Sequence, residues 1–260
     1  MIRTNVSDFT IATPCRCFYI GVMCDVSDIS LRIGSYNIRA GLGTDLRRNP
    51  ARTLATIIGL KTQMMVLQEA DFRMGHRPSA LPRRLIADAG LCAVDFGGHP
   101  DSLGWHGIAL LVAPEITVND RVCIDLPGLE PRGAIIADAE TPIGPLRIVG
   151  VHLGLLRSAR RRQLDHLRQT LGDMHQRPTV IIGDFNEWSL RRGLGRIARG
   201  FVIKTPGRSF PSRLPLLALD RIAHSPELNL STLPLPPLPK GAHASDHLPI
   251  LAEITRPAVV

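Results

Sequence analysis

The sequence predicts an α+β fold in which two mostly antiparallel β-sheets pack face to face with helices outside them. Apolar runs of strand length outnumber the helical stretches. Between residues 91 and 153, proline and glycine separate these runs at hairpin spacing. Each half of the chain also holds a strand–helix–strand segment. No linker divides residues 30–260, so we expect one domain there, preceded by a disordered extension at residues 1–29, which show no clear period.

The first half of this domain begins with a predicted strand at residues 31–38, whose apolar and polar residues alternate. Residues 49–50, Asn-Pro, are typical of a helix start, because asparagine caps the free N–H groups and proline fits the first helical position. Residues 64–67 form an apolar run typical of a buried strand. Ser79 is the expected cap of a second helix that ends at residue 89.

The second half is predicted to begin with strands and to continue with a long helix. The strands are expected at residues 91–96, 107–113, 115–124, 132–139 and 146–152. Ser158 is the expected cap of an amphipathic helix whose buried stripe is Leu164, Leu167, Leu171 and Met174, with Arg160, Arg161, Arg162 and Arg168 on its outer face. Further strands are expected at residues 179–182, 216–223 and 248–254.

Composition and charge limit the classes of protein that this chain can belong to. The 260 residues are 44% hydrophobic and 21% charged, which is ordinary for a globular protein. No apolar run approaches the ~20 residues of a membrane span, and the cysteines form no disulfide pattern, so we expect a cytoplasmic protein without stable membrane insertion. The net charge of +8 favours a phosphate-bearing partner such as nucleic acid, although arginines spread along the chain explain it equally well.

Polar side chains follow several of the predicted strands at the point where each strand ends. They are Asn37, Glu69, His152, Asp184 and Asn186, and the pair Asp246-His247 precedes the last strand. Taken singly, each is most simply a turn former or a rim histidine. Together they supply carboxylates for a hard cation such as Mg²⁺, histidines for proton transfer and amides that orient phosphate oxygens. This combination predicts metal-dependent phosphate-ester chemistry.

At these positions the chain resembles the endonuclease/exonuclease/phosphatase superfamily, which includes DNase I and related metal-dependent phosphoesterases. The resemblance covers about residues 31–255. Its segments occur in the family's order: Tyr36-Asn37-Ile38, Leu67-Gln68-Glu69-Ala70-Asp71, His106-Gly107-Ile108-Ala109-Leu110-Leu111, Pro131-Arg132-Gly133-Ala134, Val151-His152-Leu153-Gly154-Leu155, Gly183-Asp184-Phe185-Asn186-Glu187-Trp188, Leu219-Asp220-Arg221-Ile222 and Ser245-Asp246-His247-Leu248-Pro249. The resemblance implies a four-layer αββα sandwich.

The resemblance also implies a role for each residue of the site. Glu69 matches the family's metal-binding glutamate, with Asn37 and Asp246 close to the same ion, Mg²⁺ or alternatively Mn²⁺. His247 matches the essential histidine and Asp220 the acid that orients it. Asp184 and Asn186 position water and phosphate, and His152 donates to a non-bridging oxygen. Whether His247 or Asp184 is the general base stays open, and the catalytic set is therefore His152, Asp184, Asn186, Asp220 and His247.

Several alternatives remain for the substrate and for activity itself. A phosphodiester, of nucleic acid or of a phospholipid head group, competes with a phosphomonoester, and a catalytically inactive binding module is a further possibility. Ile108 stands where many relatives have asparagine, which bears on substrate choice. One arginine of residues 160–162 is a candidate phosphate contact at the helix start, with a solvated basic face as the alternative.

Overall fold

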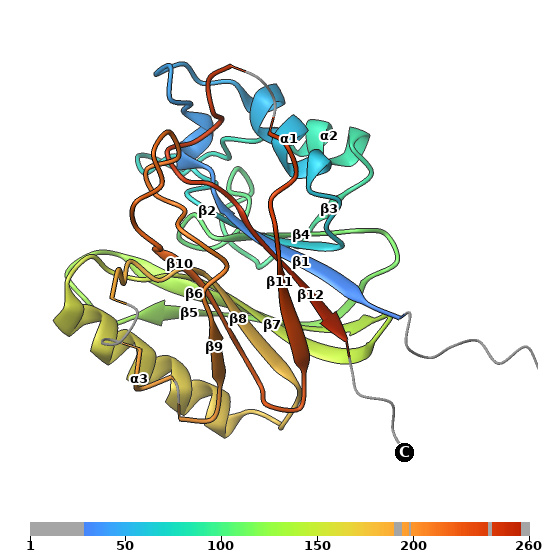
Figure 1. Ribbon diagram of the computed structural model, residues 1–260, viewed down its shortest axis with the longest axis vertical. Helices are drawn as coiled ribbons and strands as arrows, with labels where there is room; N and C mark the ends of the chain where they lie inside the picture. Colours follow the sequence, from blue (N-terminus) through green and yellow to red (C-terminus); the bar gives the residue numbers. More distant parts are fainter. Residues whose placement is uncertain (1–28, 190–193, 198, 239–240, 256–260) are drawn as a thin grey trace, which may run out of the picture.

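The computed structural model describes residues 29–189, 194–197, 199–238 and 241–255, which form two six-stranded sheets packed face to face (Figure 1). The first sheet has the order β11-β12-β1-β2-β4-β3 and the second the order β5-β6-β7-β8-β10-β9. The first sheet is built from β1 (Leu31–Asn37), β2 (Met64–Gln68), β3 (Cys92–Ala93), β4 (Ala109–Val112), β11 (Asn229–Leu233) and β12 (Ile250–Thr255). The second is built from β5 (Thr117–Leu126), β6 (Arg132–Thr141), β7 (Gly144–His152), β8 (Thr179–Asp184), β9 (Val202–Lys204) and β10 (Asp220–His224).

Helices cover the outer faces of both sheets, which confirms the predicted four-layer αββα sandwich. Helices α1 (Pro50–Gly59) and α2 (Arg83–Asp88) pack on the first sheet, and α3 (Arg157–Asp173) packs on the second (Figure 1). All strand pairs are antiparallel except β1 with β2 and β7 with β8. A short 3-10 helix at Arg39–Gly41 follows β1.

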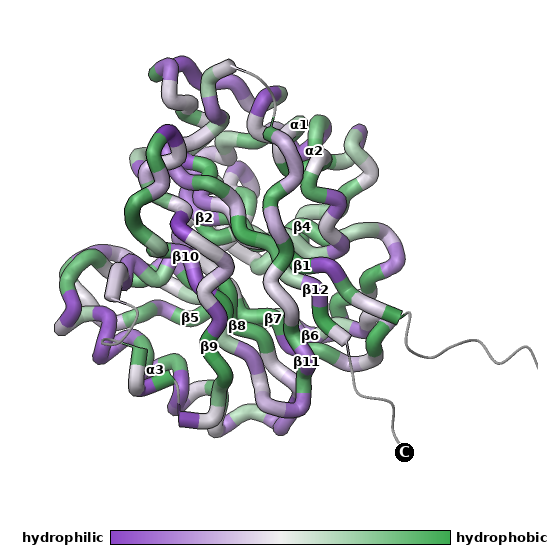
Figure 2. Tube along the Cα trace, in the orientation of Figure 1, coloured by the Kyte–Doolittle hydropathy of each residue, from purple (hydrophilic) through white to green (hydrophobic). Residues whose placement is uncertain are grey.

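The main core lies between the two sheets. It is formed by branched aliphatic side chains of both inner faces, for example Ile33, Val66, Ile135 and Ile182. Figure 2 shows apolar and hydrophilic residues alternating along α3, as a half-buried helix must. Gly150 lets the sheets approach, because an added Cβ would lie 2.8 Å from side-chain atoms of both Ile135 and Val66.

The predicted helix starts have different outcomes. Asn49 caps α1 as predicted, and its side chain accepts a hydrogen bond from the Arg52 N–H. The prediction of Ser79 as a cap is wrong, because α2 begins only at Arg83 and the Ser79 hydroxyl instead bonds to the backbone of Leu81. The prediction of Ser158 is also wrong: α3 begins at Arg157 without a side-chain cap.

Strand predictions are confirmed where the apolar run is long and fail where pairing is short. The strand expected at residues 91–96 is reduced to β3, and the one expected at 216–223 begins only at Asp220. Strands β9 and β11 were not predicted. Both have short, partly exposed sequences and take their strand conformation from the neighbours with which they pair, β10 and β12.

The predicted extension at residues 1–29 lies outside the described residues except for Ile29, so its expected disorder stays a prediction. In the part of the chain that the structure describes, no helix combines the length and the apolar character that crossing a bilayer requires.

Candidate active site

Backbone pairing brings the predicted site residues to one edge of the sandwich. Asn37 is the last residue of β1, and Glu69 directly follows the paired strand β2. In the second sheet, the register places His152 opposite Asp184 and Asp184 opposite Asp220. Parallel pairing aligns the carboxyl ends of β1 and β2 in one sheet and of β7 and β8 in the other, and the hydrogen bond from Asn37 to Asp184 shows that these two edges meet. Residues separated by up to two hundred positions therefore meet there.

Asp184 is the centre of the cluster. Its Oδ2 accepts a hydrogen bond from the Asn37 amide at 3.1 Å and lies 3.5 Å from His152 Nε2 and 3.8 Å from His247 Nε2. Its Oδ1 accepts from the backbone N–H of Asn186 at 2.9 Å. Burial raises the pKa of the Asp184 carboxyl above its ordinary value, and the neighbouring histidines oppose this shift. Asp184 thus joins residues from both sheets through one carboxylate.

Asp220 orients His247. The Nδ1 of His247 donates to Asp220 Oδ2 at 3.0 Å, and the Ser209 hydroxyl donates to the same oxygen. Burial lowers the pKa of His247, but the adjacent carboxylates of Asp220 and Asp184 outweigh it and raise the pKa to about 9. With Nδ1 held in this way, Nε2 points toward Asp184. The predicted acid–imidazole pair is therefore formed, and the imidazole faces the centre of the cluster.

His152 and Asn186 complete the polar wall of the cluster. Burial lowers the pKa of His152 to about 3, despite the opposing effect of Asp184, so its imidazole is neutral at neutral pH. The Asn186 side-chain amide donates to the Leu153 carbonyl at 2.8 Å, which links the segment after β8 to the end of β7. Asn186 has a φ of 49°, in the left-handed region that non-glycine residues seldom adopt. Such backbone is typical of functional sites.

The two remaining carboxylates, Glu69 and Asp246, flank the cluster. Glu69 pairs with Arg73 at 3.0 Å and lines, together with His152, a cavity of about 180 Å³. Asp246 precedes His247 in the chain and pairs with Arg39 at 3.2 Å. Arg39 lies two residues after Asn37, and Glu69 follows Gln68, which pairs with Asn37, so both residues lie near the end of β1. Glu69 has a φ of 51°, a second left-handed residue at this edge.

The metal group predicted from the sequence, Glu69 and Asp246 with the amide of Asn37, stays a prediction. Asp184, Asp220 and His247 form a second group, whose potential ligand atoms all lie within 4.8 Å of one another. The Oδ1 of Asp220 is buried without a hydrogen-bond partner, which is unusual for a carboxylate.

Several contacts at the site were not predicted from the sequence. Ser209 bonds to Asp220, and the Ser245 hydroxyl donates to the Asn37 carbonyl at 2.7 Å while accepting from the His247 N–H. Ser245 belongs to the Ser-Asp-His-Leu-Pro segment, so its position in that motif was an available signal. Ser209 lies in a loop without a recognisable pattern. Ile108 packs in the core between the sheets and is almost fully buried.

The prediction that Arg160 lies on the outer face of α3 is wrong, whereas a phosphate contact by one of the arginines at residues 160–162 stays a prediction. Arg160 is buried, and its guanidinium pairs with Glu187 at 2.9 Å and donates to the carbonyls of Gly154 and Leu155. Arg161 and Arg162 are exposed, as predicted for that face. The arginine at this turn of the helix therefore ties together the loops that carry the site instead of facing solvent.

Comparison with known proteins agrees with this geometry. The model of the endonuclease/exonuclease/phosphatase family matches residues 34–247, which contain every predicted site residue. The chain belongs to the endonuclease/exonuclease/phosphatase family. Members of this family are phosphoesterase hydrolases that generally use a divalent metal. The uncharacterized protein YbhP of Escherichia coli K12 is 32% identical over 225 residues, which cover 80% of this chain and 86% of YbhP.

Solved structures share the fold of this family member at low sequence identity. The catalytic domain of human Nocturnin, solved with a bound sulfate anion, has a TM-score of 0.65 at 18% identity and covers 88% of this chain and 94% of its own. ANGEL2, a 2',3'-cyclic phosphatase solved with adenosine-2',3'-vanadate, has a TM-score of 0.63 at 14% identity and covers 87% of this chain and 95% of its own. These similarities establish the fold alone.

Proposed function

We propose that this family member is a divalent-metal-dependent phosphodiesterase that cleaves its substrate, nucleic acid in particular, by in-line attack of water. The observation that carries the proposal is that three side chains converge on Asp184. Asn37 comes from the first sheet, and the two histidines are His152, at the end of β7, and His247, which Asp220 orients. A purely structural polar cluster has no need of two imidazoles directed at one buried carboxylate.

The residues fit a hard cation, Mg²⁺ or Mn²⁺. Glu69, Asp246 and Asn37 offer the oxygen ligands that such ions take. Among the described residues, the ion-pair partners of these two carboxylates are Arg73 and Arg39, whose side chains are 76% and 35% exposed. A bound cation would polarise a phosphoryl oxygen and offset its developing charge. We assign Asp220 the role of orienting His247, because its Oδ2 accepts hydrogen bonds from His247 and from Ser209.

The remaining residues position water and phosphate. The neutral imidazole of His152 donates an N–H to a non-bridging oxygen, while Asp184 and Asn186 hold the attacking water in line. The general base is Asp184 or His247, which face each other across 3.8 Å; with its pKa raised to about 9, His247 accepts the proton only in its deprotonated form. Holding the nucleophile in line and stabilising charge are the two main requirements of phosphoryl transfer.

The net charge of +8 favours a diester of nucleic acid over a small monoester, because nucleic acid presents a row of phosphates to a basic surface. ANGEL2, with the same fold, acts on a 2',3'-cyclic phosphate, which is a diester. A phosphomonoesterase, a phospholipid head-group phosphodiesterase and an inactive binding module are the alternatives that the experiment must separate.

The test is a substrate panel: bis-p-nitrophenyl phosphate, p-nitrophenyl phosphate, plasmid DNA and a phospholipid, each with Mg²⁺, Mn²⁺ or EDTA. We expect hydrolysis of the diester and of DNA, loss of both in EDTA, and little hydrolysis of the monoester. Preferential cleavage of the monoester or of the phospholipid selects that alternative. No turnover on any substrate refutes the proposal and favours the binding module.

Matched variants test the residues. Asp184→Asn and His247→Ala each lower turnover by at least ~10²-fold, the scale of losing a proton-transfer group. Asp173→Asn and His166→Ala make the same chemical changes at exposed positions of α3 and leave turnover unchanged. If Asp184→Asn is as active as Asp173→Asn, the assignment of Asp184 is wrong.

A further inference from the structure

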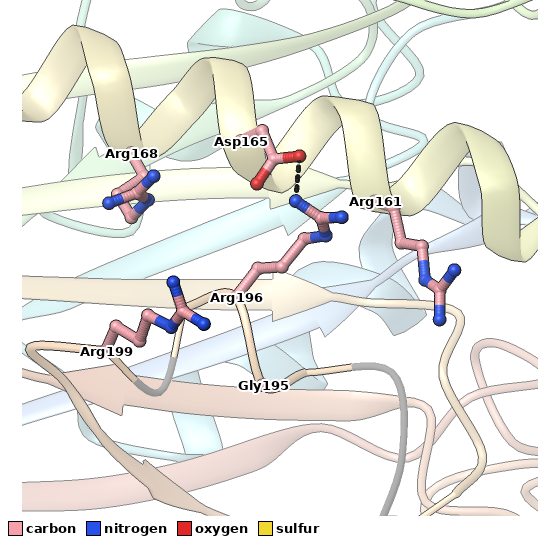
Figure 3. A pocket seen from close by; sticks show the side chains of 6 residues that line it. All are labelled: Arg161, Asp165, Arg168, Gly195, Arg196 and Arg199. Atoms are coloured by element: carbon pink, nitrogen blue, oxygen red, sulfur yellow. Dashed lines mark hydrogen bonds and ion pairs between the residues drawn. The ribbon is translucent and has the colours of Figure 1, made fainter.

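The outer face of α3 carries a basic cavity that is separate from the catalytic cluster. The cavity has a volume of about 440 Å³ and is lined by Arg161, Asp165 and Arg168 of α3 and by Gly195, Arg196 and Arg199 of the segment that precedes β9 (Figure 3). No predicted site residue lines it. The catalytic chemistry proposed above therefore does not explain why these arginines are together.

The charge of this cavity is unbalanced. Arg196 reaches across to Asp165 and forms an ion pair with it (Figure 3). Among the described lining residues Asp165 is the one acid, so the guanidinium groups of Arg161, Arg168 and Arg199 face the cavity with a surplus of positive charge. Guanidinium groups match phosphate oxygens in geometry and charge, so a phosphate-bearing ligand would balance them.

A groove leads from the catalytic cluster to the beginning of this helix. It has a volume of about 630 Å³, and its lining includes Asn186 of the cluster, the exposed Trp188, Leu155 and Arg157. The indole of Trp188 is 68% exposed, so its face is accessible. One groove therefore contains a residue of the catalytic cluster, an accessible aromatic side chain and the first residue of α3.

Three arginines continue this path along α3. Arg157, Arg161 and Arg168 are spaced by four and seven residues, which keeps them on one side of the helix. With a rise of 1.5 Å per residue, they are about 6 Å and then roughly 10 Å apart along its axis.

We propose that Arg157, Arg161, Arg168 and Arg199, called here the arginine track, bind the sugar–phosphate backbone of a single-stranded nucleic acid, with a base stacked on Trp188. The inference deepens the proposed function, since the strand would run from the scissile phosphate in the catalytic cluster onto α3. A single strand fits better than a duplex because stacking on an exposed indole needs an unpaired base.

The test measures binding of a fluorescein-labelled twelve-nucleotide oligothymidylate by anisotropy in EDTA, where no strand is cut. The track variant is Arg161→Gln/Arg168→Gln/Arg199→Gln. The matched control Arg84→Gln/Arg121→Gln/Arg162→Gln removes the same charge from exposed arginines that line neither cavity, one of them on α3. Both proteins keep the remaining arginines.

The track variant is expected to bind at least ~10-fold more weakly than the control. Its slope of log affinity against log salt should fall by about 2, since each lost contact to a single strand removes about 0.7. Trp188→Ala should weaken binding about fivefold or more, the effect of one stacked base. The oligonucleotide should also quench tryptophan fluorescence, and Trp188→Ala should remove that quenching.

Equal losses in the two triple variants would mean that only overall basicity matters, and the track would be rejected. Tighter binding of the same sequence as a duplex, or binding of phosphatidylserine vesicles in place of the oligonucleotide, also overturns it. Hydrolysis of bis-p-nitrophenyl phosphate by the wild type is scored separately. If the protein hydrolyses the diester but binds the oligonucleotide equally well without the arginine track, the proposed function stands and this inference is rejected. If binding depends on the arginine track but no hydrolysis occurs, the inference stands and the proposed function is rejected.

Discussion

The buried ion pair between Arg160 and Glu187 yields a sharp test of how the site is held together. The two side chains are only 6% and 3% exposed, and their charged atoms are 2.9 Å apart. Arg160 also donates to the carbonyls of Gly154 and Leu155, just after His152. The pair therefore connects the loop after β7, the first turn of α3 and the loop after β8.

Replacing Arg160 by methionine keeps much of the volume but leaves the Glu187 carboxylate buried without its partner. Breaking a buried pair in this way destabilises a protein by about 3–5 kcal/mol. For a domain of this size we expect the melting temperature to fall by roughly 6–20 °C. The exposed neighbour Arg161→Met is the matched control, with an expected change within ~0.5 kcal/mol.

The second half of this test is the double variant Arg160→Met/Glu187→Gln, which removes both charges. Because no unpaired charge stays buried, the double variant should be more stable than Arg160→Met alone. The assays are urea unfolding followed by circular dichroism and thermal melting of all variants. If Arg160→Met loses no more stability than Arg161→Met, or if Arg160→Met/Glu187→Gln is no more stable than Arg160→Met alone, the pair does not have the role described.

Three further predictions concern other parts of the fold. Burial lowers the pKa of His224, whose Nδ1–H donates to the Ser225 carbonyl, so the unfolded chain binds a proton first as the pH falls below about 6.5, and acidification lowers the stability of the fold. Urea unfolding at about pH 7.5 and about pH 5.5 should therefore show a smaller loss of stability on acidification in His224→Gln than in the wild type. An equal loss in the two proteins would contradict this. Gly183→Ala should lower the free energy of unfolding by about 3 kcal/mol or more and should also lower turnover, because the φ of Gly183 is 152° and a Cβ there would lie 2.0 Å from the Val151 carbonyl oxygen. An unchanged melting temperature and unchanged activity would contradict this. Leu167→Ala should lose about 2–5 kcal/mol in the core beneath α3, and thermal melting against the exposed control Gln169→Ala checks this.

The sequence was sufficient for those features that depend on local pattern. Alternating and continuous apolar runs predicted most strands of both sheets, and the Asn-Pro pair predicted the start of α1 correctly. Polar residues at strand ends predicted which side chains meet, because parallel strands bring their carboxyl ends to one edge. The pairing of His247 with Asp220 was instead implied by the resemblance to the family, because Asp220 begins β10 and His247 lies in the loop before β12.

The tertiary structure decided what depends on contacts between distant segments. Helical periodicity put Arg160 on the outer face of α3, but an acid 27 positions away draws it inward, and no local pattern records that pairing. Strands β9 and β11 exist because neighbouring strands supply their hydrogen bonds. Ser209 reaches Asp220 only because a patternless loop folds over the site. Local sequence thus set the elements and the chemistry of their ends, while burial and long-range pairing set which charged side chains are held inside.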